Sequence, residues 1–316
     1  MLVYIAMGLG LMKENYYIHL YQKIDDTLIK KSELVKTNKY NIGIVTSRGV
    51  NQNRRFNQDC AAIVTHPRGE NLAMLIVADG LDDSVNGYVA SQVVVRRLGR
   101  WFERLPKTYV NNPIILESFL FEELRDINTM LYEGIDKSSE AAFSLAILGK
   151  RETMIANVGS CRGYTIKGTQ PTLQTVDHLK WFAYNPDLKI SPDEVKFLLA
   201  KDGLSKTVGG SDSRKHYFEP SINIIDNNYD SLVLTTHGVT DVLDGDELGR
   251  IVGESSVESA LAQITTRALF ANPEQVPEAL VERFQKAGKA RMLMRETVPG
   301  STASTAIVLK KTKKNS

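Results

Sequence analysis

The sequence has almost no cysteine: Cys60 and Cys161 are the two in 316 residues. They do not form a CxxC pair, and the five histidines show no spacing typical of zinc ligands. A disulfide framework and a structural zinc site are therefore not expected. Because unpaired cysteines are the rule in reducing compartments, we expect the chain to be cytoplasmic.

An excess of charge of either sign is also missing. Lys and Arg number 39 against 37 Asp and Glu, which gives a formal net charge of +2. A chain with so small a net charge has no overall field that attracts nucleic acid or anionic lipid. We therefore expect no nucleic-acid partner.

The N-terminal apolar run is too short for a membrane span. It comprises the first 12 residues, MLVYIAMGLGLM, whereas a transmembrane helix needs roughly 20. The run also lacks the basic segment and the small-residue cleavage site of a signal peptide. We expect no stable membrane insertion, and a protein start at Met12 is an alternative to a weak anchor.

Hydrophobic periodicity predicts an α+β protein. A capping-box pattern, Ser191 with Glu194, predicts one helix. Paired strands separated by blocks of helices indicate antiparallel sheets with packed helices. Further helices are expected at 86–105, 113–132, 248–269 and 277–294, and strands at 40–46, 61–65, 72–78, 141–148, 153–158, 221–225, 231–235 and 304–309.

The length of the chain allows one large domain or two small ones, and we expect one domain over residues 39–310. An N-terminal extension at 1–38 precedes it, and a basic tail at 311–316 follows it. Within the extension, YYIHLY at 16–21 is a candidate strand, and the Lys-rich stretch after it is expected to be exposed.

One strand end is a candidate metal ligand. The apolar run from Ala73 to Ala78 is followed by Asp79 and Gly80. A buried strand fixes the position of the acid, and the glycine lets the chain turn sharply. A carboxylate held in this way suits a hard cation. A plain Asp-Gly turn after a core strand is the alternative.

Seven segments follow one another along the chain: RRFNQD, VADGLDDSVNGYVAS, ANVGSCRGY, TVDHL, LSKTVGG, LVLTTHGVTDVLDGDEL and STASTAIVL. In this order they resemble the motifs of the protein phosphatase 2C (PPM) family of metal-dependent protein serine/threonine phosphatases, and the likeness runs from Asn41 to Lys310. The resemblance implies a two-layer antiparallel β-sandwich flanked by helices on both sides (αββα). It also implies two divalent cations, Mn²⁺ or Mg²⁺, whose bridging water attacks phosphorus.

The resemblance assigns roles to several residues of this chain. Asp79 corresponds to the acid that bridges both cations, the carbonyl of Gly80 to a ligand, and Asp59 to the acid that orients metal-bound water. Arg54 or Arg55 corresponds to the phosphate-binding arginine, whose fork pairs phosphate oxygens bidentately. The local spacing does not choose between these two, and a solvated surface arginine is the alternative for either.

Other positions of the family's site carry different residues here. They are Gln58 in place of a Glu, Ser160 in place of an Asp, His237 in place of an Asp, and Thr302-Ala303 in place of an Asp-Asn pair. His237 has three interpretations: a replacement metal ligand, a general acid, or a residue that fills the place of a lost carboxylate. Asp82 or Asp83 could partly compensate, with loop acids facing water as the alternative.

The remaining charge predicts a weakened metal centre. Asp59 and Asp79 are the anionic groups left from the family's set, and imidazole is a softer, neutral ligand. Two dications on so little negative charge repel each other and bind weakly.

Two functions follow from the resemblance. The first is a pseudophosphatase, a module that binds a phosphoprotein or a partner kinase without hydrolysis. The alternative is a diverged but active phosphatase for phosphoserine and phosphothreonine, using one cation or a different metal on Asp59, Asp79, Gly80 and His237.

Overall fold

A computed structural model gives the fold of most of the chain. It describes residues 18–20, 31–37, 39–49, 56–67, 69, 71–81, 85–180, 182, 185, 189–198, 203–210, 218–272, 274–289, 293 and 303–312. Within that part of the chain, none of the helices combines the length and the apolar character that a membrane span needs.

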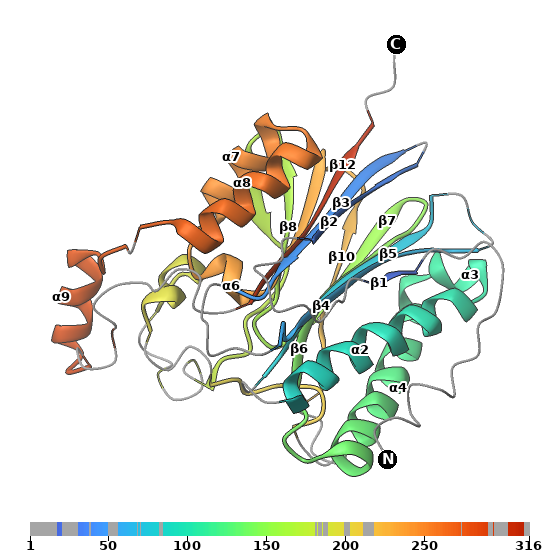
Figure 1. Ribbon diagram of the computed structural model, residues 1–316, viewed down its shortest axis with the longest axis horizontal. Coiled ribbons are helices and arrows are strands. Elements are labelled where there is room, and N and C mark those ends of the chain that lie inside the picture. The colour runs from blue at the N-terminus through green and yellow to red at the C-terminus, as the bar shows by residue number, and fades with distance from the viewer. Residues whose placement is uncertain are drawn as a thin grey trace.

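Two six-stranded antiparallel sheets form the centre of the molecule (Figure 1). The first, sheet A, has the order β1 (Ile18–Leu20), β4 (Asp59–Thr65), β5 (Ala73–Gly80), β6 (Ala141–Leu148), β7 (Glu152–Val158), β10 (Ser221–Asp226). The second, sheet B, has the order β2 (Lys31–Lys36), β3 (Tyr40–Ser47), β12 (Ser304–Lys311), β11 (Ser231–Thr235), β8 (Arg162–Lys167), β9 (Gln170–Leu173).

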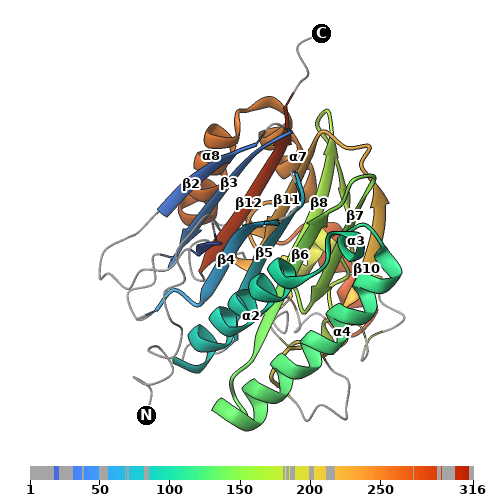
Figure 2. The same cartoon turned by 90° about the vertical axis from the view of Figure 1, so that its right-hand side faces the viewer.

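Helices cover the outer face of each sheet (Figure 2). Sheet A carries α2 (Val85–Arg104), with α3 (Lys107–Val110) and α4 (Pro113–Thr129) beside it, and α4 continues into a π-helical turn at Met130–Ile135. Sheet B carries α7 (Gly245–Glu254) and α8 (Val257–Phe270). This arrangement confirms the predicted αββα sandwich.

Three apolar layers follow from the two-residue period of the strands. On β5, Leu75 and Val77 point between the sheets, whereas Met74 and Ile76 point outward under α2. A third cluster joins sheet B to α7 and α8. Each fully buried Leu or Val contributes roughly 1.5–3 kcal/mol relative to an exposed one. Apolar contacts on both faces of both sheets therefore stabilise the sandwich.

The predicted helix at 248–269 is wrong as a single element. The structure has two helices there, because two caps start them separately. The Asp244 carboxylate accepts the Glu247 N–H at 2.7 Å at the start of α7, and the Ser256 hydroxyl accepts the Ser259 N–H at 3.2 Å at the start of α8.

Other predicted elements are shorter, or differ in type. The helix expected at 277–294 is α9 (Glu278–Lys286), and Gly288 follows it at φ 69°. The helix expected from Ser191 is one short 3₁₀ segment, Pro192–Phe197, although the predicted cap is present: the Glu194 carboxylate accepts the Ser191 N–H at 2.8 Å.

The N-terminal region contributes to both sheets. β1 lies inside the candidate strand at 16–21 and pairs with β4, while β2 pairs with β3. Strand β2 was not predicted, because its lysines indicated an exposed stretch. The domain boundaries at residues 38 and 310 remain predictions.

Candidate functional site

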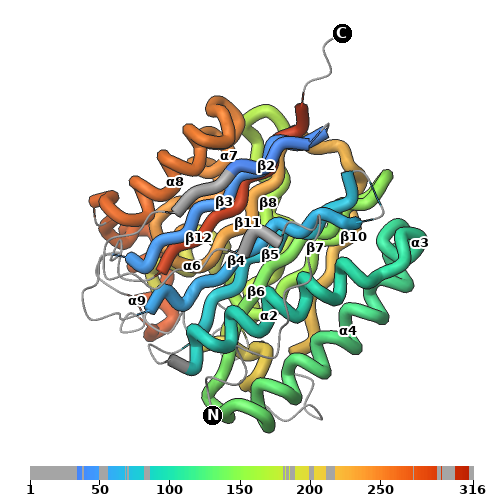
Figure 3. Tube along the Cα trace, turned by 45° about the vertical axis from the view of Figure 1, so that its right-hand side comes forward, coloured from blue at the N-terminus to red at the C-terminus, as the bar shows by residue number. Residues whose placement is uncertain are grey.

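Polar residues replace apolar ones where the inner faces of the strands reach one end of the sandwich. On β4 and β5 the buried series Ala61 and Val77 continues into Asp59 and Asp79, which pair across the two strands. In sheet B the inward-facing apolar series likewise continues into polar residues, namely Thr46 on β3, Thr305 on β12 and Thr236 directly after β11. Figure 3 shows these strands running together through the two layers. The alternation of each strand therefore gathers two carboxylates and three hydroxyls.

Asp59 is the centre of a buried hydrogen-bond network. The Thr236 hydroxyl donates to Asp59 Oδ2 at 2.7 Å and accepts the Thr305 N–H at 3.0 Å. The Thr305 and Thr46 hydroxyls lie 2.7 Å apart, and the Asn57 side-chain amide donates to Thr46 at 2.7 Å. Asn57 Oδ1 in turn accepts the Asp59 N–H at 3.1 Å. Both sheets thus hold the position of this carboxylate.

Burial raises the pKa of Asp59 well above its usual range, and the nearby Asp79 carboxylate raises it further. Hydrogen bonds from the Thr236 and Thr305 side chains, and the nearby His237, lower the pKa of Asp59. Asp59 Oδ1 is buried and has no hydrogen-bond partner in the described part of the chain. One oxygen of the carboxylate is therefore satisfied, and the other is open to a ligand.

His237 lies against Asp79. Its Nδ1 contacts Asp79 Oδ2, and its side chain is 25% exposed while that of Asp79 is 10% exposed. His237 begins the short helix α6 (His237–Thr240), which places the imidazole over the strand end. The sequence predicted both residues as members of one site, and the structure brings them together.

Gly80 fixes the approach of helix α2 to the site. A Cβ atom on Gly80 would lie 1.9 Å from the carbonyl oxygen of Gly87, so another side chain does not fit. The Gly80 N–H donates to the carbonyl of Gln58 at 3.1 Å. This glycine therefore holds the strand ends carrying Asp59 and Asp79 close to the first turn of α2.

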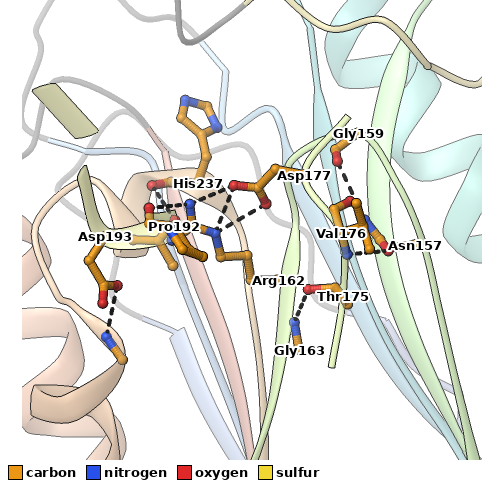
Figure 4. A network of polar contacts seen from close by, with 12 residues as sticks. Asn157, Gly159, Arg162, Gly163, Thr175, Val176, Asp177, Pro192, Asp193 and His237 are labelled. Atoms are coloured by element: carbon orange, nitrogen blue, oxygen red, sulfur yellow. Dashed lines mark hydrogen bonds and ion pairs between the residues drawn. The ribbon is translucent and has the colours of Figure 1, made fainter. Parts of the chain in front are cut away.

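A buried ion pair borders the site on sheet B. The Arg162 Nη2 lies 2.6 Å from Asp177 Oδ2 and 2.7 Å from the carbonyl oxygen of Pro192, so that Arg162 sits between these two groups (Figure 4). Arg162 is 3% exposed and Asp177 6%. Both residues lie in segments that carry the resemblance, but their pairing was not predicted.

His178 is a structural histidine. Its Nδ1 accepts the Gly159 N–H at 3.0 Å, so its proton lies on Nε2, 2.8 Å from the hydroxyl oxygen of Ser221. Burial lowers the pKa of His178 to about 4, and Lys206 contributes to the shift. An Nε2–H donor cannot accept the Ser221 proton, so this pair does not form a nucleophile and base.

The structure covers part of the predicted residue set. Arg54, Arg55, Asp82, Asp83 and Thr302 lie outside the described residues. Gln58 and Ala303 are buried beside the site, and Ser160 shares a cleft of about 20 Å³ with Arg162, Asp177 and His237. The catalytic and metal-binding roles of all these positions remain predictions.

The hydroxyls of Thr46, Thr236 and Thr305 were missed as site residues. The alternation of β3, β11 and β12 could have indicated them. In each strand, the inward-facing series of apolar residues is followed by a threonine at the end of the sandwich where the site lies. The described residues contain no group of three or more His, Cys, Asp or Glu placed to hold a metal ion. Asp59 Oδ1 is the open buried acceptor of this site.

Comparisons with known proteins agree with the fold. No protein-family model matches the chain. The serine/threonine phosphatase Stp of Listeria welshimeri is 25% identical over 240 residues, which cover 73% of this chain and 91% of that protein. The serine/threonine phosphatase Stp1 of Staphylococcus aureus superposes with a TM-score of 0.64 at 22% identity, covering 93% of this chain and 98% of that structure.

A third relative was solved with metal. The catalytic domain of the serine/threonine protein phosphatase PstP, in complex with two manganese ions, superposes with a TM-score of 0.60 at 15% identity, covering 87% of this chain and 99% of that one. The fold is thus that of the metal-dependent protein phosphatases. Together with the sequence relatives, it confirms that the chain resembles the protein phosphatase 2C-type family.

Proposed function

We propose that this chain is a pseudophosphatase, which recognises phosphoserine- or phosphothreonine-containing proteins at the Asp59–Asp79 end of its sandwich without the family's two-cation hydrolysis. The substrate class comes from the family, whose relatives are named as serine/threonine phosphatases. The proposal that the chain binds without hydrolysing rests on the groups that surround the Asp59 and Asp79 carboxylates.

The contact between His237 and Asp79 carries the proposal. In the family arrangement, the acid at position 79 bridges both cations and the residue at position 237 is a second acid. In this chain the second acid is an imidazole whose Nδ1 lies on the Asp79 carboxylate. An Nδ1–H there competes with a cation for the same oxygen, because each is a partner of the same carboxylate lone pairs.

The charge balance supports the same reading. Two dications about 4 Å apart repel by on the order of 15–20 kcal/mol at an effective dielectric of about 20. Several carboxylates normally offset such repulsion. Asp59 and Asp79 supply two negative charges, and Ala303, where the family has Asn beside the final Asp, supplies no ligand atom.

A second candidate function is an active phosphatase with one cation. The open, buried Oδ1 of Asp59 favours it, since a ligand is needed to satisfy that atom. Asp59, Asp79 and the Gly80 carbonyl are oxygen donors suited to Mn²⁺ or Mg²⁺. When bound, such a cation would supply Lewis-acid activation of phosphate. The names of the relatives also favour this candidate.

Calorimetric titration of metal-free protein with Mn²⁺ separates the two candidates. The proteins are the wild type, Asp79→Asn and His237→Asp. The proposal expects weak Mn²⁺ binding that Asp79→Asn leaves unchanged, and an affinity at least about tenfold higher in His237→Asp, which restores a carboxylate. It also expects equal phosphate release from a phosphothreonine peptide by the wild type and Asp79→Asn.

Tight binding of Mn²⁺ to the wild type, lost together with phosphate release in Asp79→Asn, supports the active phosphatase and overturns the pseudophosphatase proposal. A cytoplasmic setting fits either function, because both cysteines are free thiols. A protein kinase would then supply the phosphorylated partner.

A further inference from the structure

Strand β10 is the last strand on one side of sheet A, and in the described part of the chain it pairs with β7 alone (Figure 2). The pairing covers the whole strand, Ser221–Asp226. One residue further, the Asn227 N–H donates to the carbonyl of Arg151 at 3.1 Å. In an antiparallel strand the backbone groups of alternate residues point to alternate sides. This bond therefore leaves Ile222 and Ile224 with backbone N–H and C=O groups that point away from β7, along a free edge.

The edges of sheet B are protected, whereas the free edge of β10 is not. Strand β9 carries Pro171, which has no N–H, and α7 packs beside it. Strand β2 carries Lys31 and Lys36. Proline and lysine on an edge strand oppose the addition of a further strand. Ser221–Asp226 contains neither, and Ile224 is 39% exposed. The free edge of β10 is therefore suited to accept another strand.

The two ends of the free edge restrict which strand fits. At one end, Pro220 continues the alternation with a carbonyl but no N–H. At the other end, the Asp226 carbonyl already accepts the Asn228 N–H at 2.7 Å, so Asp226 offers its N–H alone. Two residues placed opposite each other in an antiparallel pair exchange N–H and C=O groups. Pro220 and Asp226 therefore complement each other, because one supplies the acceptor and the other the donor.

A second copy of β10 provides this complementary strand. When two copies run antiparallel about a two-fold axis at Asn223, Pro220 lies opposite Asp226 of the second copy. Ile222 then lies opposite Ile224 of the second copy, and these side chains form apolar cross-strand pairs. Each backbone group that points outward between Pro220 and Asp226 gains a partner. Like charges do not face each other, since Asp226 is the one charged residue of the strand.

We infer that β10 joins two copies of this chain, edge to edge, into one continuous sheet. The interface is isologous, with its two-fold axis at Asn223. Strand β10 begins at the end of the sandwich where Asp59 and Asp79 lie. Because the two strands run antiparallel, the two sites lie at opposite ends of the joined sheet. The pairing does not involve the site residues, so the inference is independent of the proposed function.

Cysteine cross-linking of the full chain tests the position of the axis. The natural thiols, Cys60 and Cys161, are buried and do not interfere. The two Asn223 residues of the inferred dimer form a non-hydrogen-bonded pair with Cα atoms about 4.5 Å apart, within the range of a disulfide. The two Asp226 residues lie roughly 20 Å apart, since each residue adds about 3.4 Å along a strand. With a copper–phenanthroline oxidant, we expect Asn223→Cys to form disulfide-linked dimer at least about tenfold faster than the matched control Asp226→Cys.

Sedimentation equilibrium without cross-linking is the second measurement. We expect the mass of the wild type to rise toward that of a dimer as its concentration is raised to about 100 μM, which detects dissociation constants of that order. Ile224→Lys should weaken association by about tenfold or more, because it places a charge in both apolar cross-strand pairs. The matched control is Ile114→Lys on α4, where the isoleucine is 77% exposed, and it should associate like the wild type.

A wild type that stays monomeric at about 100 μM overturns the inference and leaves the free edge to a strand of another protein. Equal cross-linking of Asn223→Cys and Asp226→Cys overturns it as well, because the contact then has another register or lies elsewhere. A dimer that Ile224→Lys leaves unchanged contradicts the use of β10.

Discussion

The Thr236 hydroxyl donates to Asp59 Oδ2 across 2.7 Å and joins residues 177 positions apart in the sequence. The two belong to different sheets, with Asp59 on β4 of sheet A and Thr236 at the end of β11 of sheet B. Both are buried, at 1% and 0% exposure. The hydrogen bond therefore links the two layers at the end where the site lies.

Replacing Thr236 by Val should lower the free energy of unfolding by about 2–3 kcal/mol, because a buried carboxylate loses its donor and the Thr305 N–H loses its acceptor. Urea unfolding measures the change. Thr172→Val, on the exposed side of β9, is the matched control and should change stability by less than about 0.5 kcal/mol. Equal effects in both variants would show that the inter-sheet hydrogen bond contributes nothing.

Asp177→Asn should destabilise the fold by about 3–5 kcal/mol, because it leaves the nearly buried Arg162 charge without its counter-ion. Asn keeps the shape of the side chain, so packing changes little. Glu122→Gln removes a surface ion pair with Arg125 and should cost no more than about 0.5 kcal/mol. Chemical denaturation of both variants checks the contrast, and a loss below 1 kcal/mol in Asp177→Asn contradicts the proposed strength of the buried pair.

The stability of the protein should fall on acidification through His178. Its folded pKa of about 4 lies below the ordinary 6.5. The unfolded chain therefore binds the proton first, and the contribution of neutral His178 is complete above pH 6.5 and lost between 6.5 and about 4. By pH 5 the wild type should lose about 2 kcal/mol more than His178→Asn, relative to pH 7.5.

Asn is the suitable replacement for His178 because its side-chain oxygen can accept the Gly159 N–H without titrating. Urea unfolding across the pH range, for both proteins, gives the two stability profiles. Parallel profiles would mean that His178 does not contribute to the pH dependence.

Gly80→Ala should cost about 3 kcal/mol or more, since the added Cβ meets a backbone oxygen of α2 at 1.9 Å and that oxygen has no side-chain freedom to move. Thermal and urea unfolding measure the loss. Gly134→Ala is the control: the nearest atom to its added Cβ is Met130 Cγ at 3.9 Å, an ordinary contact. It should change stability by no more than about 1 kcal/mol in either direction. Similar behaviour of the two variants would contradict the close approach of α2.

Much of the fold was predictable because its signals are local. The alternation on β5 and the apolar face of α2 need only neighbouring residues, and the order of motifs gave the sandwich. The division of α7 from α8 was missed because the capping strength of Asp244 and Ser256 depends on backbone geometry as well as residue type. Strand β2 was missed because an edge strand tolerates lysines that resemble a solvated loop.

The candidate site was half predictable. The motifs indicated Asp59, Asp79 and His237, and the resemblance to the family predicted that the three residues lie together. The three threonines have no motif of their own, and their importance depends on partners in other strands. The pairing of Arg162 with Asp177 likewise needed the loop after β9 to be placed in space.

The sequence by itself determined which residues face inward, because the two-residue period of a strand is a local property of the chain. It also predicted how much carboxylate charge remains at the positions that the resemblance assigns to the site. The tertiary structure decided which of these groups touch. Thr236 reaches Asp59 and His237 reaches Asp79, because the packing of two separate sheets sets these distances and no local pattern encodes them.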